Sequence, residues 1–306
     1  MQKVATVILH YNGAKNTLEC LESLEKVNLS KETNLEIVVV DNASKEKLKT
    51  QNSKLKNKEV EVIRNEENLG YAEGNNIGIR YALKNGADYI LVLNNDTIVD
   101  KSLIKELLNA IKRDKNIGIV APKIYFAKGF EFHKDRYKKE ELGHVLWYAG
   151  GEIDYKNVIG HHIGVDEVDY GQYDKAEETY FASGCCMFIK KEVFDKVGFF
   201  DKKYFLYYED ADLSERVKKA GYKITYKPSA VLWHKNAGSA GGSGSVLQDY
   251  YITRNRLLFG FRYASMRSKI ALVKESLSVL LRGRYWQKRG VLDFYLKRFG
   301  KGSFEI

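Results

Sequence analysis

Four short runs of apolar and β-branched residues in the first third of the chain limit the folds that it can adopt. They span residues 4–10, 35–41, 60–64 and 89–94, and most of them are apolar on both faces. Such runs are typical of central strands in a parallel sheet covered by helices. Helical patterns alternate with them, around Leu18, over residues 75–84 and over residues 103–111. This order predicts an α/β fold with an open, doubly wound and mainly parallel twisted sheet.

Local signals also predict where some of these elements begin and end. Asn16 and Glu19 fit a capping pair at the start of the first helix, and Gly86 fits a stop after residues 75–84. Residues 127–173 have no clear period, which indicates function or disorder in so long a segment. The glycine–serine run at residues 238–244 predicts a flexible loop over a site or a plain linker.

Composition narrows the class of protein. The 306 residues contain no run near the roughly 20 apolar residues that a membrane-spanning helix needs. The first residues enter a strand-like run directly, without the features of a secretory signal. Three cysteines, two of them adjacent, do not make a disulfide framework. We therefore expect a cytoplasmic protein.

Positive charge is concentrated near the C-terminus. Residues 246–306 carry 13 Lys and Arg against 4 Asp and Glu, which is a net charge of +9 out of +10 for the whole chain. This segment reads as mainly helical, so the charge is either a solvated helical surface or a region that attracts anionic lipid headgroups or a lipid-linked diphosphate. No nucleic-acid-binding motif accompanies it. We expect no nucleic-acid partner and a peripheral contact with the inner face of the cell membrane.

Polar residues follow three of the predicted strands. They are His10 to Gly13, Asp41 to Ser44 and Asn94 to Thr97. In open α/β sheets ligands bind beyond the C-terminal ends of the strands. A single carboxylate there can simply cap the next helix. Three such ends on one edge favour a binding site.

The sequence around these strand ends excludes two common ways of holding phosphates. Neither the glycine-rich dinucleotide fingerprint nor the P-loop signature is present. A divalent cation with oxygen ligands can do this instead, and Asp96 at the tip of an apolar strand suits Mg²⁺. His234 follows a later strand and is either structural or a nitrogen ligand, which would favour Mn²⁺.

The densest acidic cluster lies directly before a predicted helix. It contains Glu209, Asp210 and Asp212 and follows five apolar or aromatic residues, 204–208. Acids favour helix N-termini, which is sufficient to explain Asp212. An aromatic wall beside a carboxylate also raises its pKa, so the other two are candidates for a general base.

Several smaller features have a bland and a functional interpretation. Trp147 with its neighbour Tyr148 is either an acceptor-binding, sugar-stacking surface or plain core. Gly184 fits close approach to a donor sugar or a strand bulge. Cys185 and Cys186 read as packing residues. The adjacent His161 and His162 lack partners at metal-ligand spacing and read as surface residues.

Taken together, the motifs resemble a known family. They are VILHYNG, VVDNAS, NLGYAEGNN, LNNDT, SGCCMFIKKEVFDKVGFFD, FLYYEDADLSERVKKAGYK and LWH, in this order from about Val4 to His234, with a YYxxRN echo at Tyr250 to Asn255. This set is similar to glycosyltransferase family 2, in particular to its rhamnosyltransferase-like members. The resemblance implies the GT-A fold, a nucleotide-sugar-binding α/β domain.

The resemblance also implies a donor site. Tyr11, Asn12 and Asp41 match positions that hold the nucleotide base and ribose, and the segment with Asn68, Gly70 and Asn75 lines the same pocket. Asn94, Asn95 and Asp96 match the family's DxD motif, which binds the metal and the donor diphosphate. The first acid of that motif is Asn94 here, which leaves Asp96 as the main carboxylate ligand of Mg²⁺ or Mn²⁺.

Further roles follow from the same resemblance. His234 matches a histidine that some relatives use for the metal, Asp210 matches the general base, and Glu209 would position the acceptor. Arg254 is expected to meet the diphosphate. The family inverts the anomeric centre by one in-line displacement, with the cation acting as Lewis acid at the leaving group.

We therefore expect a metal-dependent glycosyltransferase. Residues 1–245 would form the catalytic domain, with a nucleotide-binding half at 1–125 and an acceptor half at 126–245, and residues 246–306 a basic helical extension. The donor would be a dTDP-rhamnose-like or UDP sugar, and the acceptor a glycan or a lipid-linked glycan. A silent glycan-binding protein of the same fold and a sugar nucleotidyltransferase are the alternatives. The oligomeric state stays open.

Overall fold

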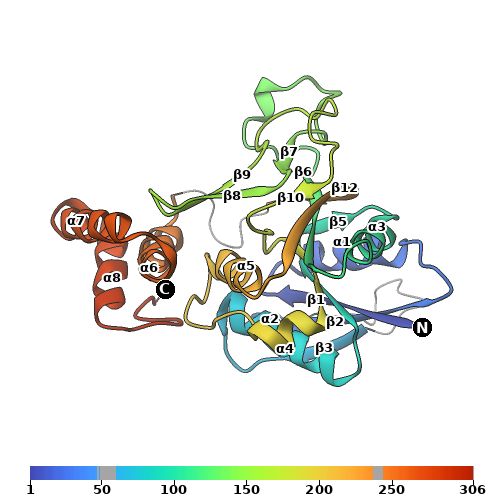
Figure 1. The fold of residues 1–306 in the computed structure, drawn as a ribbon, viewed down its shortest axis with the longest axis horizontal. Coiled ribbons are helices and arrows are strands. Elements are labelled where there is room, and N and C mark those ends of the chain that lie inside the picture. The colour runs from blue at the N-terminus through green and yellow to red at the C-terminus, as the bar shows by residue number, and fades with distance from the viewer. Residues whose placement is uncertain (47, 49–59, 237–243, 306) are drawn as a thin grey trace.

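The central sheet takes its strands from both halves of the chain (Figure 1). The computed structural model describes residues 1–46, 48, 60–236 and 244–305. The strands lie in the order β10, β12, β6, β11, β4, β1, β2, β3, with β5 beside β12 and β7 beside β6. Their bounds are Gln2–His10 (β1), Thr33–Asp41 (β2), Val60–Arg64 (β3), Tyr89–Asn94 (β4), Thr97–Val99 (β5), Ile117–Phe126 (β6), Leu146–Tyr148 (β7), Glu177–Glu178 (β10), Cys186–Lys190 (β11) and Lys223–His234 (β12).

The first four strands form the parallel part of this sheet. Strand β1 pairs with β2 and β4, and β2 pairs with β3, all in parallel. In this register His10 lies opposite Asp41, and Leu9 lies opposite Asn94. The predicted parallel α/β sheet is confirmed, and the C-terminal ends of β1, β2 and β4 share one edge.

Helices cover both faces of the sheet. They are α1 (Ala14–Glu25), α2 (Gly70–Lys84), α3 (Leu103–Ile111), α4 (Lys191–Val197) and α5 (Glu209–Lys219). His10 of β1 contacts Thr17 of α1, whereas Leu9 packs against Gly74 of α2. Because successive side chains of a strand point to opposite faces, α1 and α2 lie on opposite sides of the sheet.

Two predicted helix starts are wrong. Helix α2 begins at Gly70 rather than Asn75, because the carbonyl oxygen of Phe205 accepts hydrogen bonds from the amides of Tyr71 and Ala72, at 2.6 and 3.2 Å. This cap comes from a distant part of the chain, so no local signal marks it. Helix α1 has Gly13 at its N-cap and no side-chain cap.

The expected capping pair of α1 has a different partner. Asn16 Oδ1 accepts a hydrogen bond from Lys235 Nζ at 3.2 Å, and Glu19 forms an ion pair with the same lysine. The two residues therefore tie α1 to the end of β12 instead of closing the helix. The predicted stop at Gly86 is confirmed by its left-handed φ of 82° after α2 ends at Lys84.

The second half of the sheet is mixed. Strand β11 lies antiparallel between β4 and β6, and β12 runs parallel to β6. Strand β12, after which His234 was expected to follow, includes His234 as its last residue and has an irregularity between Lys227 and Val231. Its last residue, His234, pairs with Thr97 of β5. This pairing returns the chain to the edge where β4 ends.

The segment without sequence period forms an ordered lobe beside the sheet (Figure 1). It contains the 3-10 turn Lys134–Arg136, strand β7 and the hairpin of β8 (Gly151–Asp154) and β9 (Ile159–His162). Lys123 is buried under this lobe and forms ion pairs with Asp169 and Asp174, at 2.7 and 2.6 Å. The order comes from such long-range pairs, which the sequence pattern does not display.

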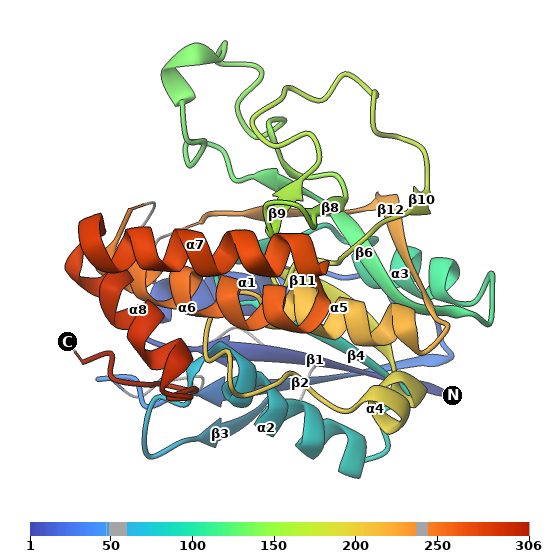
Figure 2. The same ribbon diagram turned by 60° about the vertical axis from the view of Figure 1, so that its left-hand side comes forward.

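Three helices follow the sheet: α6 (Val246–Tyr263), α7 (Met266–Arg282) and α8 (Tyr285–Tyr295). They confirm the predicted C-terminal helices and stand beside the sheet at one end of the molecule (Figures 1 and 2). The domain boundary at residue 245 stays a prediction. Within the described part of the chain, no helix has both the length and the apolarity needed to cross a membrane. The glycine–serine run predicted as a loop lies, except for Gly244, outside the described residues.

Candidate active site

The strand-end edge, by which we mean residues 10–13, 41–44 and 94–97, forms one side of the site. After β1 the chain turns through two left-handed residues, Asn12 and Gly13, with φ of 59° and 69°. The amide of Asn12 donates to Ser44 Oγ at 2.9 Å, which joins this turn to the end of β2. Tyr11, which directly precedes Asn12, is 37 % exposed and open to a ligand.

Asp41 is buried at the end of β2. Its Oδ1 accepts the amide of Ser44 at 2.9 Å, and its other oxygen pairs with the guanidinium of Arg64. The carboxylate of Asp41 therefore links the backbone of Ser44 to the side chain of Arg64 at the strand-end edge.

Asn42 organises the next pocket wall, and sequence reasoning did not single it out. Its Nδ2 donates to Asn68 Oδ1 at 2.8 Å, and its Oδ1 accepts the amide of Leu69 at 3.0 Å. Asn68 Oδ1 also accepts the amide of Gly70 at 2.9 Å. Asn42 stands beside Asp41 in VVDNAS, and its complete burial at a strand end is the feature that marks it.

Gly70 and Asn75 belong to the start of α2. A Cβ on Gly70 would lie 2.5 Å from the carbonyl oxygen of Phe205, so only glycine fits there. Asn75 is buried and its Nδ2 donates to the carbonyl of Tyr71 at 2.9 Å. Its Oδ1 has no hydrogen-bond partner among the described residues. An unpaired buried acceptor is costly, and a bound donor group would relieve it.

Asp96 and His234 meet across 138 residues of sequence. Their Oδ1 and Nε2 atoms lie 3.0 Å apart, and both side chains are largely buried. The amide of Lys235 donates to the carbonyl of Asp96 at 2.9 Å, and Asn95 Nδ2 donates to Thr17 at 2.9 Å. Strand β5 and the end of β12 thus hold the turn that carries Asn94, Asn95 and Asp96.

This pair fits part of a metal site. Within residues 1–46, 48, 60–236 and 244–305 no group of three or more His, Cys, Asp or Glu could hold a metal ion. The pair supplies one carboxylate oxygen and one imidazole nitrogen, which suits Mn²⁺, and a carboxylate alone suits Mg²⁺. A cation here would therefore need its remaining ligands from water or from a donor phosphate.

The second side of the site is the base turn, which we define as residues 204–210. Phe205, Tyr207 and Tyr208 all have left-handed φ, of 65°, 69° and 72°. Bulky residues rarely adopt this conformation, and each costs roughly 1–3 kcal/mol unless the surroundings enforce it. Strain of this kind is typical of sites where the chain must present a particular side chain.

Asp210 is the side chain presented there. Its Oδ2 accepts the amide of Gly184 at 2.9 Å, and its Oδ1 accepts the amide of Ala211 at 2.8 Å. Burial raises the pKa of Asp210 above its usual value, and these backbone hydrogen bonds oppose part of the increase. The carboxylate is therefore oriented, and its proton affinity is increased, as a general base requires.

Glu209 differs from its neighbour. Burial raises the pKa of Glu209 well above its usual value, and the carboxylate of Asp210 adds to the effect. Its Oε2 has no hydrogen-bond partner among the described residues. Burial therefore favours the protonated form of Glu209, and one of its oxygens is available to a ligand. The prediction that the hydrophobic setting raises carboxyl pKa values in this cluster is confirmed for both residues.

Gly184 connects the two sides. It bonds Asp210 through its amide, and its carbonyl accepts the hydroxyl of Tyr71 from α2. The carbonyl of the next residue, Cys185, accepts the amide of Asn94 at 2.9 Å. The path from Asp210 to the turn that carries Asn94, Asn95 and Asp96 is therefore only a few residues long. Cys185 and Cys186 are buried free thiols, as predicted.

Arg254 does not lie where the resemblance implies. Its guanidinium is fully buried and donates to the carbonyls of Gly300 and Tyr204, at 2.7 and 2.9 Å. It has no exposed surface with which to contact a diphosphate. The physical reason is that α6 packs directly behind the base turn, so its inward side chains serve that turn.

The next residue, Asn255, was not predicted as a site residue. Its Nδ2 donates to the carbonyls of Tyr204, Leu206 and Tyr207, at 2.8, 2.8 and 2.9 Å. It is fully buried and thus supports the strained backbone of the base turn. The RN pair in YYxxRN was the signal, but its partners could not be inferred from sequence.

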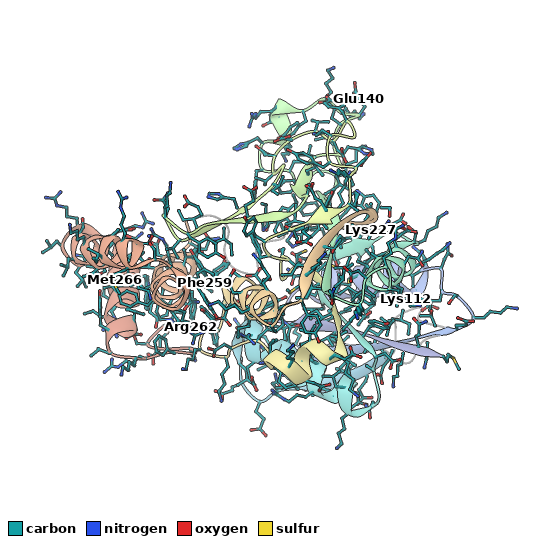
Figure 3. All side chains as sticks on the ribbon, in the orientation of Figure 1. Lys112, Glu140, Lys227, Phe259, Arg262 and Met266 are labelled. Carbon is teal, nitrogen blue, oxygen red and sulfur yellow. The ribbon has the colours of Figure 1, made fainter. Side chains whose placement is uncertain are left out.

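A second link joins α6 to α5. Arg262 forms ion pairs with Asp212 and Asp201, at 2.8 and 2.7 Å, and Asp212 also pairs with Arg216. Figure 3 shows Phe259 and Arg262 on the side of α6 that faces α5. Asp212 is therefore buried and paired with two arginines. The preference of acids for helix N-termini does not explain these contacts.

Trp147 lies beside the candidate metal pair. Its ring contacts His234 and His162, with centroids 4.6 and 4.4 Å apart. The prediction that His162 is a surface residue is wrong, because it packs between Trp147, Tyr148 and Phe181 and burial lowers its pKa to about 4. His162 is the last residue of β9, and its Nδ1 lies 3.1 Å from the carbonyl oxygen of Trp147 in β7.

Two relatives with known roles share most of this chain. A hexosyltransferase of low-salt glycan biosynthesis, Agl10 of Haloferax volcanii, is 27% identical over 81% of this chain and 74% of the relative. The dTDP-rhamnosyl transferase RfbF of Shigella flexneri is 28% identical over 83% of this chain and 79% of the relative.

A solved structure and a family model complete the comparison. The mannosyltransferase PcManGT from Pyrobaculum calidifontis, solved with GDP-Man and Mn²⁺, superposes with a TM-score of 0.56 at 15% identity, over 99% of this chain and 76% of that one. It shares the GT-A fold expected from the sequence. The model of Glycosyl transferase family 2 matches residues 6–198, which is more than half of the chain. The chain belongs to glycosyl transferase family 2.

Proposed function

We propose that this nucleotide-sugar-dependent glycosyltransferase works by a single inverting displacement with Asp210 as its base. The observation that carries the proposal is the short path from Asp210 through Gly184 and Cys185 to Asn94, next to Asp96 and His234. A base and a diphosphate-binding turn must lie this close for a hydroxyl to attack from one side while the diphosphate leaves from the other.

The donor would lie along the strand-end edge. Tyr11, Asn12 and Asp41 would surround the base and ribose, with Asn68, Gly70 and Asn75 in the opposite wall. The buried unpaired Oδ1 of Asn75 supports a donor group of the ligand at this position. The name of RfbF favours a dTDP-rhamnose-like sugar, and a UDP sugar fits the same pocket.

Asp96 and His234 would hold Mg²⁺ or Mn²⁺ together with the donor diphosphate, with Asn94 and Asn95 in the same turn. A bound cation would stabilise the charge that develops on the leaving nucleoside diphosphate. The Mn²⁺ in the PcManGT structure supports this use of a divalent ion.

Asp210 would take the proton of the acceptor hydroxyl as its oxygen bonds to the anomeric carbon. The amide of Gly184 donates to one carboxylate oxygen of Asp210, and the amide of Ala211 in α5 donates to the other. Glu209 would position the acceptor through its buried carboxyl group, whose Oε2 has no hydrogen-bond partner among the described residues. Trp147 would stack on a sugar ring of the acceptor, which would be a glycan or a lipid-linked glycan. A cytoplasmic enzyme would meet a lipid-linked acceptor at the inner face of the membrane.

Incubation with a panel of nucleotide sugars, Mn²⁺ and a glycan acceptor tests the proposal. Release of nucleoside diphosphate with a larger glycan product is expected. Release of pyrophosphate would instead identify a nucleotidyltransferase. Binding of donor or glycan without turnover on any donor would identify a silent binding protein.

A further inference from the structure

Helix α7 carries an apolar stripe on its exposed side. Met266, Ile270, Val273, Leu277 and Leu281 are 70%, 52%, 37%, 56% and 77% exposed. Their spacing of three and four residues places them on one face of a helix. Leu272 and Ser276, on the inward face, are buried against α6 and α8.

This arrangement reverses the usual amphipathic pattern. A surface helix normally turns its apolar residues inward and its charges outward. Here the helix packs through a narrow inward face, and large aliphatic side chains are exposed to solvent on its outer face. The stripe continues into α8 with Tyr285, which is 66% exposed. Exposed apolar surfaces of this extent mark interaction sites.

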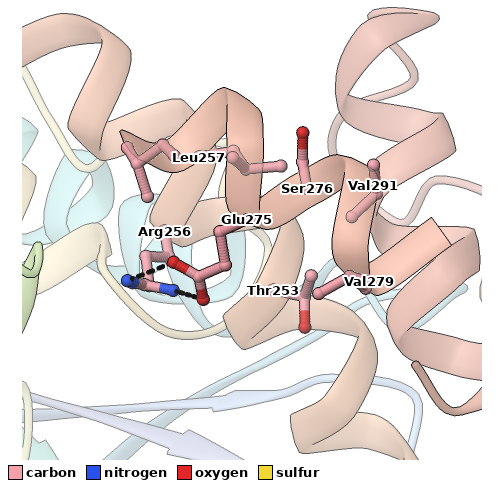
Figure 4. Close-up of a pocket in the computed structure, with 8 residues that line it drawn as sticks. Thr253, Arg256, Leu257, Glu275, Ser276, Val279 and Val291 are labelled. Atoms are coloured by element: carbon pink, nitrogen blue, oxygen red, sulfur yellow. Dashed lines mark hydrogen bonds and ion pairs between the residues drawn. The ribbon is translucent and has the colours of Figure 1, made fainter. Parts of the chain in front are cut away.

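Positive charges border the stripe. Arg267, Lys269 and Lys274 lie on α7 beside it. The single acid of the helix, Glu275, is neutralised from the inner side, because Arg256 of α6 bonds both of its oxygens at 2.5 and 3.0 Å (Figure 4). The outer face of α7 is therefore apolar and cationic, without an opposing free carboxylate on this helix.

We infer that α7 docks the protein on an anionic lipid surface, with the stripe of Met266 to Leu281 inserted at the headgroup boundary. Helices with an apolar face and a Lys- and Arg-rich border lie in that plane. The surrounding segment, with its net charge of +9, is attracted to the same surface.

Charge complementarity favours lipid over a second copy of the chain. Two copies joined through this stripe would bring their Arg267, Lys269 and Lys274 side chains together, and like charges repel. Anionic headgroups would neutralise them instead. The position of α7 supports the same occupant, because the helix lies along the outer end of the molecule, away from the sheet (Figures 1 and 2).

The inference is independent of the proposed function, since it needs no statement about donor, metal or acceptor. It does have a consequence for the enzyme. A protein held on a bilayer by α7 would meet acceptors that are themselves anchored in lipid.

Vesicle sedimentation of the full chain tests the inference. Vesicles of phosphatidylcholine and phosphatidylglycerol in equal parts should bind the protein, and pure phosphatidylcholine should bind it much less. Ile270→Ser with Leu277→Ser should weaken binding about tenfold or more, because two aliphatic side chains that would insert into the lipid are replaced by polar ones. Arg267→Gln, Lys269→Gln and Lys274→Gln together should weaken binding to anionic vesicles by a similar factor and reduce its salt dependence.

A matched control is Val62→Ser with Val165→Ser, two exposed aliphatic residues outside the C-terminal helices, which should bind like the wild type. All variants should melt near the wild-type temperature, because the changed side chains are at least partly exposed. Equal binding by the Ile270→Ser, Leu277→Ser variant would overturn the inference. So would a concentration-dependent wild-type dimer, seen by light scattering, that this variant abolishes.

Discussion

The strand-end edge and the base turn both present a carboxylate to the site, but by opposite means. On the strand-end edge, Asp41 and Asp96 lie where a parallel sheet places its C-terminal ends, and side chains of β3 and β12, Arg64 and His234, pair with them. In the base turn, Asp210 follows three left-handed residues that Asn255 of α6 holds from behind. The sheet register already places a side chain at a strand end, whereas a strained turn keeps its backbone conformation only when a distant helix holds it.

The largest expected effect separates the two acids of the base turn. Asp210→Asn should lower kcat about 10²–10⁴-fold, because the proton acceptor is lost, while donor binding on the strand-end edge stays unchanged. Glu209→Gln should keep most of the activity, since burial raises the pKa of Glu209 and glutamine keeps a hydrogen-bond donor of similar size at this position. Rates of nucleoside diphosphate release and the Kd of the donor check both. An inactive Glu209→Gln with an active Asp210→Asn would move the base to Glu209.

The next test concerns the strand-end edge. After removal of metal with EDTA, His234→Ala should need roughly 10–100-fold more Mn²⁺ for half-maximal rate, because a nitrogen ligand is lost. His162→Ala is the matched control, since it contacts the other side of Trp147 and is no ligand in the proposal. An unchanged Mn²⁺ requirement in His234→Ala would leave that residue a structural partner of Asp96.

Asn255→Ala tests whether α6 positions the base turn. Loss of the amide leaves buried carbonyls unpaired and should cost about 1–3 kcal/mol of unfolding free energy. Asn76→Ala is the control, because Asn76 is equally buried and bonds both backbone groups of Phe200, away from the turn. Both variants should be destabilised, but only Asn255→Ala should lower kcat with an unchanged donor KM. A parallel loss in both would mean that stability alone explains the effect.

Gly70→Ala tests the contact between the two regions. Both Gly70 and Gly86 have left-handed φ, so alanine at either should cost about 1–2 kcal/mol. At Gly70 the new methyl group also meets the carbonyl oxygen of Phe205, which should add about 1–3 kcal/mol. Gly86 has nothing within 4 Å. Equal unfolding free energies of the two variants, measured in urea, would show that the carbonyl group of Phe205 moves away from the new methyl group at no cost.

The smallest effect is a pH dependence of stability. Because the folded state raises the pKa of Glu209, this group favours folding only while it is protonated. As pH rises above its unfolded value near 4.5, the free energy of unfolding of the wild type should fall relative to Glu209→Gln. Urea denaturation of both proteins from acidic to neutral pH measures this difference. A difference that stays constant with pH would mean that Glu209 ionises normally in the folded protein.

Much of the donor side could be predicted because its signals are local. The apolar runs identified β1 to β4, and the polar residues after β1, β2 and β4 do share one edge. The start of α2 could not be predicted, because Phe205 caps it from a distance. Arg254 was assigned to the diphosphate by its motif, yet it is buried behind the base turn.

Sequence by itself determined the parallel part of the sheet, the order of its strands' polar ends and the acidic pair at the start of α5, because these depend on residue type and on periodicity over a few residues. The tertiary structure decided which residues meet. It brought His234 to Asp96 through β5 and β12, and it placed Asn255 behind the base turn. Contacts of this kind arise from packing and hydrogen bonding between distant segments, and no local pattern in the chain encodes them.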